Sequence, residues 1–225
     1  MAQVGIHALL GASLRKKIPK KELLLLGLIL GNLLPDADNL AVAFATLTGN
    51  STEGLHRTFT HSFITALGIG ILLYLAGWMF QRSALGNLGV GLGVGIVMHI
   101  VVDLLVWFDG VQILWPFPVW VNLWENVGPP LWWSKLMMPV EFLFLAGYLM
   151  LLYRWAQESK SNLDFLPKLR IGMMILLGLF VVFTVLVYFM ESGYKIPYGA
   201  MYLVMMGVIV WATLRMRQTL EFEGA

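Results

Sequence analysis

The sequence contains no cysteine and few charged residues. Without cysteine, the chain can form neither disulfides nor thiolate zinc sites. Only 12% of its residues are charged and 59% are hydrophobic, a composition outside the range of soluble globular domains. A net charge of +2, with no basic stripe carrying interleaved aromatics, argues against nucleic acid as a partner. The chain is therefore expected to be an integral membrane protein.

Long apolar runs predict an all-α, polytopic membrane fold with about six transmembrane helices. A helix needs about 20 apolar residues to cross the hydrocarbon core of a bilayer. Unbroken runs of that kind cover residues 62–80, 86–108, 135–153, 170–190 and 198–214.

The run 22–47 is also long enough, but the polar segment NLLPDADNL interrupts it. Pro35 lacks a backbone donor and disfavours helical geometry at Leu34. We therefore expect the first span to be broken at Pro35, with a helix to about residue 33 and a second short helix after the break. The break should face the protein interior, because lipid cannot satisfy irregular backbone.

Basic residues predict the orientation in the membrane. The loops that carry most of the Lys and Arg lie on one side if both termini are cytoplasmic. On the opposite side the loops hold only Arg57, Lys135 and Lys195. A cytoplasmic His7 conflicts with a location near His56 and His61 on the far side, so the side on which a site opens is left undecided.

The ionisable residues are concentrated in one half of the chain. All four histidines, and three of the five aspartates, lie in short patches within residues 7–103. Ionisable groups inside a membrane span are costly, so they are functional candidates by default. Four imidazoles and three carboxylates exceed what one tetrahedral zinc requires, and two or more divalent metal ions are therefore expected.

Two of these patches fall inside expected spans. In HIVVD, His99 and Asp103 are four residues apart and share one helix face. They could bind a ligand or simply neutralise each other. In PDAD, Asp36 and Asp38 can point to one side of an extended segment, where a divalent cation would offset their repulsion. The alternative is an aqueous loop within an apolar run.

The segment HRTFTHS carries His56, Arg57 and His61. Thr60 is expected to be the N-cap of the second span, which would put His61 in its first turn. Neutral imidazole binds zinc well, and carboxylate oxygens complete mixed nitrogen and oxygen sites. Arg57 could contact a phosphate through its planar fork, or could anchor the chain at the lipid headgroups.

Together, VGIHALLGASL, GNLLPDADNL, HRTFTHSF and GIVMHIVVDLL followed by GVQILWPF resemble the membrane-bound metal-dependent hydrolase family. This family comprises bacterial and archaeal inner-membrane proteins, and the resemblance covers about residues 4–118. A more distant similarity links the order of the motifs to the zinc-dependent phospholipases C. The chain departs from the common family pattern at Thr58 and Phe59, where small or apolar residues are usual, and at Asn39, where histidine often stands.

The resemblance implies a set of metal ligands: His7, Asp36, Asp38, His56, His61, His99 and Asp103. It also implies an inner-membrane location. The metals would be zinc or manganese, and a metal-activated water would attack a phosphoester of a lipid or other amphiphile. Asp36 or Asp38 is the expected general base, and Arg57 would hold phosphoryl oxygens.

Other classes of function stay open. Buried His and Asp pairs beside a broken helix also occur in divalent-cation transporters and sensors. A transporter should carry polar groups in both halves of the membrane, whereas the later spans offer only Glu141, expected near the interface. A non-catalytic membrane scaffold is the third class. A protease is disfavoured, because the chain has no cysteine, no G-x-S-x-G and no H-E-x-x-H.

Two domains are expected. Residues 1–118 form a metal-site membrane domain, and residues 119–225 form an interfacial loop with three C-terminal spans. Those spans could build a lipid-facing wall, a dimer surface or a partner site, and no motif decides among these.

Overall fold

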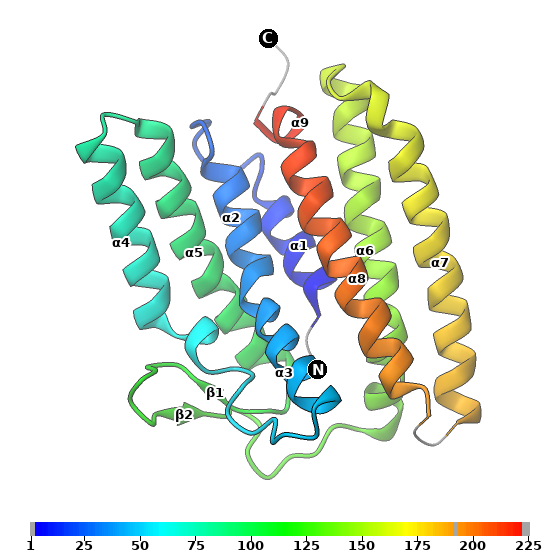
Figure 1. Cartoon of the computed structure of the whole chain (residues 1–225). Helices are drawn as coiled ribbons and strands as arrows, with labels where there is room; N and C mark the ends of the chain where they lie inside the picture. The colour runs from blue at the N-terminus through cyan, green and yellow to red at the C-terminus, as the bar shows by residue number, and fades with distance from the viewer. Residues whose placement is uncertain (1–2, 191–192, 222–225) are drawn as a thin grey trace. The chain divides into compact units, whose positions relative to one another are not determined.

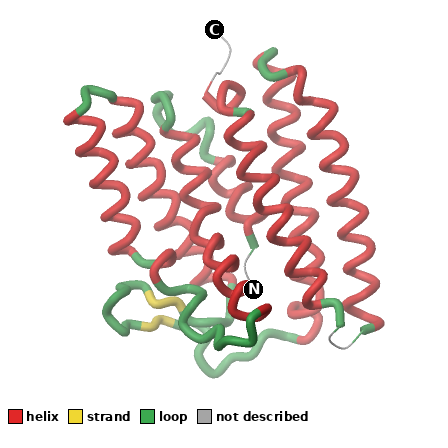
Figure 2. Tube along the Cα trace, viewed as in Figure 1, coloured by secondary structure: helices red, strands yellow, loops and turns green. Residues whose placement is uncertain are grey.

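The computed structural model describes residues 3–190 and 193–221 (Figure 1). These residues are mostly helical, with one short two-stranded sheet (Figure 2). Five helices among them are long and apolar enough to cross a membrane, which confirms the expected all-α membrane fold. The chain divides into two compact units, residues 13–128 and residues 3–12 with those from 129 onward. This division does not test the expected domain boundary at residue 118.

The first span has the expected break at Pro35. Helix α2 (Leu24–Leu33) ends at Leu33, a 3-10 helix η1 (Leu34–Asp38) follows, and α3 (Asn39–Leu47) completes the span. Pro35 occupies the first turn of η1, where a missing backbone donor is tolerated. The break is therefore a tightened helical turn that carries both Asp36 and Asp38, with Asp36 buried.

Helix α5 (Ser83–Val106) packs against α2 on one face and against α4 (Phe63–Met79) on the other (Figure 1). Glycines make both contacts possible. A Cβ atom added at Gly95 would lie 2.4 Å from the carbonyl oxygen of Leu28, and one added at Gly89 would lie 2.8 Å from that of Gly70. With only 17 residues, α4 is the shortest of the expected spans, near the lower limit for crossing a bilayer.

A hairpin follows α5 and supports the segment HRTFTHS. Strand β1 (Val111–Gln112) pairs antiparallel with β2 (Trp120–Val121). The backbone N–H of Gln112 donates to the carbonyl of Arg57 at 2.9 Å, and that of Phe63 donates to the carbonyl of Ile113 at 2.8 Å. Val111 is buried in an apolar cluster with Ala66, Ile96 and Ile100. The hairpin thus fixes the entry of the chain into α4.

The other unit contains the C-terminal helices and α1. Its helices are α1 (Val4–Ser13), α6 (Leu131–Ser159), η3 (Leu163–Phe165), α7 (Leu166–Phe189), α8 (Lys195–Arg215) and α9 (Arg217–Glu221). Phe142 stacks on Phe183 with ring centroids 5.5 Å apart. Glu141, expected near the interface, is fully buried and accepts a hydrogen bond from the backbone N–H of Gly5 at 2.8 Å. Since α6 begins at Leu131 rather than near residue 135, Glu141 lies further inside the helix than expected.

Candidate metal centre

The segment HRTFTHS is compact and is not the first turn of α4. Arg57 adopts a left-handed backbone with φ of 61°, and Phe59–His61 form the short 3-10 helix η2. Ser62, not Thr60, is the N-cap of α4, because its Oγ accepts from the backbone N–H of Ile64 at 3.2 Å. The expectation for Thr60 is therefore wrong. The Thr60 hydroxyl instead forms hydrogen bonds with Asp38 and His61.

Four side chains from η1, η2 and α5 converge in the interior of the unit formed by residues 13–128. We call them the inner cluster: Asp36, His61, His99 and Asp103. Each is at most 2% exposed. The Nε2 atoms of His61 and His99 lie 3.0 Å apart.

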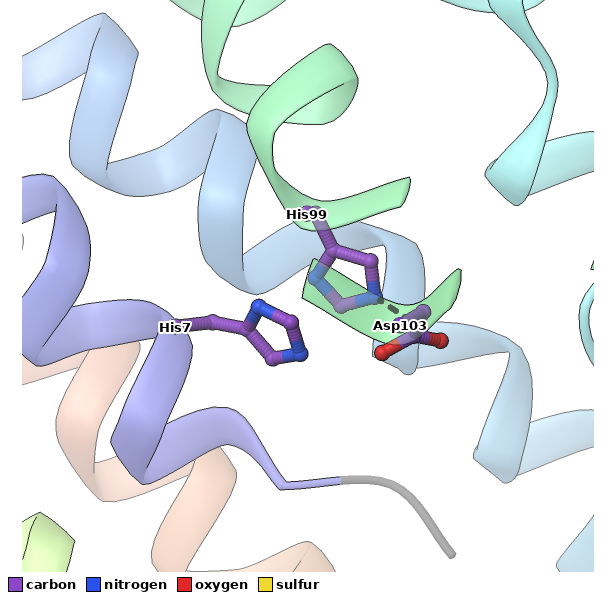
Figure 3. A group of neighbouring side chains, drawn as sticks. All are labelled: His7, His99 and Asp103. Atoms are coloured by element: carbon purple, nitrogen blue, oxygen red, sulfur yellow. Dashed lines mark ion pairs between the residues drawn. The ribbon is translucent and has the colours of Figure 1, made fainter. Parts of the chain in front are cut away.

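One oxygen of each carboxylate faces these two nitrogens. Oδ1 of Asp36 lies 3.8 Å from both Nε2 atoms. Oδ2 of Asp103 lies 3.6 Å from Nε2 of His61 and 3.8 Å from that of His99. His99 and Asp103 face each other from adjacent turns of α5 (Figure 3).

The hydrogen-bond partners of the two Nδ1 atoms decide whether each Nε2 carries a hydrogen or a lone pair. Nδ1 of His99 lies 2.8 Å from the carbonyl oxygen of Asn32, which can only accept, so Nδ1 carries the hydrogen. The Thr60 hydroxyl donates to Oδ2 of Asp38 at 2.9 Å, so its oxygen accepts from Nδ1 of His61 at 2.9 Å. In the neutral rings, both Nε2 atoms consequently present lone pairs.

This donor set fits a divalent cation. Two imidazole lone pairs face an oxygen of each of two carboxylates, an arrangement that a shared positive charge stabilises. Mixed nitrogen and oxygen sets of this kind suit zinc. Ligand atoms about 2.0–2.2 Å from a tetrahedral zinc lie about 3.3–3.6 Å from one another. The distance between the two ring nitrogens and the four distances from these nitrogens to the carboxylate oxygens run from 3.0 to 3.8 Å and bracket that spacing.

Asp38 and His56 form a second group beside the inner cluster. Oδ1 of Asp38 lies 2.7 Å from Nδ1 of His56. Its Oδ2 accepts from the Thr60 hydroxyl and, at 3.1 Å, from the backbone N–H of Arg57, and lies 3.3 Å from Nδ1 of His61. Both oxygens of Asp38 thus accept hydrogen bonds from groups in HRTFTHS. Asp38, His56 and His61 also lie close enough together to hold a metal ion.

Arg57 is buried next to the inner cluster. Its Nε lies 3.4 Å from Oδ2 of Asp103, and its Nη1 lies 3.4 Å from Oδ2 of Asp109. The Arg57 side chain is 3% exposed, whereas that of Asp109 is 70% exposed. The guanidinium therefore connects the buried carboxylate of Asp103 to the surface of this unit.

Comparison with known proteins identifies the family. Residues 2–217 match the family described as YdjM inner membrane protein. The chain belongs to this family. The protein named Inner membrane protein YbcI, from Escherichia coli strain K12, is 34% identical over 118 residues, which are 52% of this chain and 66% of that protein. The chain thus spans just under two thirds of that relative. No solved structure matches.

These names support the expected inner-membrane location of this YdjM family protein. Neither name mentions a hydrolase, a metal or a phospholipase. The expected hydrolase family and its zinc therefore remain proposals, and so does the predicted orientation of the termini.

Most of the expected site residues of this YdjM family protein come together. Asp36, Asp38, His56, Arg57, His61, His99 and Asp103 all lie in the unit formed by residues 13–128. His7, also drawn in Figure 3, lies on α1 in the other unit, so its part in the site stays a prediction.

Three contributors to the site are absent from the sequence-based set: the Asn32 carbonyl, the Thr60 hydroxyl and Asp109. Asn32 acts through a backbone group that any residue would supply. Thr60 matched the pattern of a helix cap, and Asp109 lies just beyond the end of α5, where no helical spacing links it to Arg57. Of the three, only Thr60 could have been suspected from the sequence, because its side chain is polar.

Proposed function

We propose that this protein is a membrane-embedded, metal-dependent hydrolase that cleaves a phosphoester of a lipid or other amphiphile. The observation that carries the proposal is the convergence of two imidazole nitrogens and two carboxylate oxygens in the buried inner cluster. Asp36, His61, His99 and Asp103 would hold the first divalent cation, with zinc favoured and manganese as the alternative. A bound cation of this kind supplies Lewis-acid activation of water and of a phosphoryl oxygen.

Asp38 is best suited to position other side chains. Its carboxylate orients His56 directly and His61 through the Thr60 hydroxyl. Carboxylates that hold imidazole rings in this way fix the tautomer and the ring orientation. The Asp38 and His56 pair also has the composition of a general base, in which the imidazole takes the proton and the carboxylate stabilises the resulting charge. The His56 side chain is 23% exposed, but Nε2, the nitrogen left to take the proton, is buried.

Arg57 would hold the substrate. A guanidinium presents a planar fork that matches two phosphoryl oxygens. The contact of Nη1 with the exposed Asp109 is the one that a substrate phosphate can replace at least cost, because surface ion pairs contribute little. The contact of Nε with Asp103 would keep the guanidinium beside the cation. The expected second metal would use Asp38, His56 and His61 in place of the positioning and general-base roles of Asp38 and His56, because the Nδ1 atoms of both histidine rings would first have to lose their hydrogens.

Hydrolysis assays on the full chain, purified in detergent and loaded with Zn²⁺ or Mn²⁺, test this function. The substrates are a chromogenic phosphodiester and a short-chain phospholipid. We expect turnover that a chelator abolishes, that His99→Ala removes and that Asp164→Asn retains, since Asp164 lies in the other unit and is 68% exposed.

A folded, metal-loaded protein that hydrolyses none of these phosphoesters would overturn the proposal. Metal-ion flux into proteoliposomes, lost in His99→Ala and accompanied by no hydrolysis, would favour the cation transporter instead.

A further inference from the structure

An apolar groove runs along the outer side of the contact between α4 and α5. Its volume is about 360 Å³. Gly70 on α4 and Gly89 and Gly93 on α5 form part of its lining, and larger side chains such as Ile71, Val90 and Val94 complete it. Because the glycines have no side chains, the two helices approach closely and leave a hollow above their contact. The groove is thus a consequence of the glycine pattern of α5.

A polar pocket adjoins the groove where α4 ends and α5 begins. Its volume is about 410 Å³, and Tyr74 lines both spaces. Lys21, Gln81, Ser83 and Asn87 contribute polar groups to this pocket. Lys21, from the segment before α2, is the one charged residue among its lining residues and is exposed. The two spaces therefore meet at Tyr74, and the second carries polar groups and one positive charge in its lining.

We propose that these two spaces together bind one anionic phospholipid, with an acyl chain in the groove and the phosphate beside Lys21. An occupant of both spaces must be apolar along about 12 Å of helix, from Ala66 to Tyr74, and then polar. Within a membrane, the molecule with that profile is a lipid. A lysine at the polar end selects a negatively charged headgroup.

The headgroup end of the lipid site lies far along α5 from the inner cluster, whereas Val97 and Met98, at the other end of the groove, directly precede His99. Ser83 opens α5 at the polar pocket, and His99 follows it by 16 residues, which is about 24 Å of α-helix. The proposal therefore does not depend on the proposed hydrolase function. A lipid bound there would cover the contact of α4 with α5 and hold α4 against the helix that carries His99 and Asp103.

Photo-labelling tests the site. The probe is phosphatidylglycerol with a diazirine in one acyl chain, added to the full chain in phosphatidylcholine vesicles, and labelled peptides are quantified by mass spectrometry. We expect labelling to concentrate on the groove residues of α4 and α5. Val94→Trp, which fills the groove, should abolish that labelling. Val101→Trp is the matched control, since Val101 lies on the same helix, is 43% exposed against 46% for Val94 and does not line the groove.

Substitution of Lys21 tests whether the polar pocket binds the lipid headgroup. Lys21→Gln should weaken labelling by phosphatidylglycerol about fivefold, the effect expected for one lysine near an anionic lipid. Lys17→Gln, an exposed lysine outside the pocket, should leave it unchanged.

The thermal midpoint of each variant shows whether it is folded. Equal labelling of folded Val94→Trp and Val101→Trp, or labelling spread evenly over all spans of the wild type, would overturn the proposal.

Discussion

The Nε2 atoms of His61 and His99 lie 3.0 Å apart in the protein interior, although 38 residues separate the two histidines in the sequence. Both rings use Nδ1 to donate to an oxygen of the chain, the Thr60 hydroxyl for His61 and the Asn32 carbonyl for His99. The hydrogen bonds therefore leave the lone pairs on the two Nε2 atoms, which face the carboxylates of Asp36 and Asp103. This arrangement underlies the proposed metal site and the predictions that follow.

The Thr60 hydroxyl should set the metal affinity through His61. Thr60→Val removes the hydroxyl that accepts from Nδ1 of His61 and donates to Asp38. We expect zinc affinity to fall about 10- to 100-fold, as for other groups that orient a ligating histidine. Competition with a chromophoric chelator measures the affinity. Thr60→Ser is the control and should bind nearly as well as the wild type, whereas equal loss in both variants would contradict the role of the hydroxyl.

Substitutions of Asp36 and of Asp38 should differ in their effect on metal binding. Asp36 faces both Nε2 atoms of the inner cluster, whereas Asp38 accepts from groups of HRTFTHS. Asp36→Asn should abolish binding of the first metal ion, because it replaces a ligand. Asp38→Asn should weaken that binding and lower turnover while the first ion is retained. Metal stoichiometry and turnover are measured in parallel, and complete loss of metal in Asp38→Asn with retention in Asp36→Asn would reverse the assignment.

Helix packing behind the site should depend on Gly31. A Cβ atom there would lie 2.3 Å from the carbonyl oxygen of Leu92, so Gly31→Ala must separate α2 from α5. Overpacking of this kind costs about 1–3 kcal/mol and would shift the Asn32 carbonyl away from His99. We expect a lower thermal midpoint in detergent and weaker metal binding. Gly68→Ala, which meets no atom within 4 Å, should leave both unchanged. An unaltered midpoint in Gly31→Ala would show that the two helices are not in close contact.

The two ion pairs of Arg57 should contribute unequally to stability. Arg57→Met removes the cation 3.4 Å from the buried carboxylate of Asp103, and loss of one partner of a buried pair costs about 3–5 kcal/mol. Asp109 is 70% exposed, so Asp109→Asn should cost at most about 1 kcal/mol. Thermal unfolding of the metal-free protein compares the variants. Equal destabilisation by Arg57→Met and Asp109→Asn would contradict the unequal contributions of the two ion pairs.

Much of the fold follows from local chemistry that the sequence displays. Apolar runs locate the long helices, and Pro35 ends α2 at Leu33 as expected. The spacing of Gly91 and Gly95 brings α5 against α2, as small residues do in membrane helices. The ends of α6 were less predictable, because Leu131, Trp132 and Trp133 fit a membrane interface as well as a helix.

The candidate site was only partly predictable. The identities of Asp36, His61, His99 and Asp103 stand out, because ionisable residues are rare in apolar spans. Which nitrogen of each ring faces the interior could not be deduced, since it depends on the Asn32 carbonyl and the Thr60 hydroxyl. The role of Asp38 as an acceptor for HRTFTHS depends on the fold of that segment, including the left-handed backbone of Arg57. Long-range geometry of this kind leaves no periodic pattern in the sequence.

The most direct test is the metal content of the full chain, purified in detergent after exposure to Zn²⁺ and Mn²⁺ and then dialysed. Elemental analysis compares the wild type with the double variant His61→Ala, His99→Ala and with the control Asp164→Asn, and circular dichroism verifies that each is folded. We expect at least one tightly held metal ion per chain in the wild type and the control, and none in the double variant. A metal-free wild type, or a folded double variant that retains the same metal content, would contradict the metal centre.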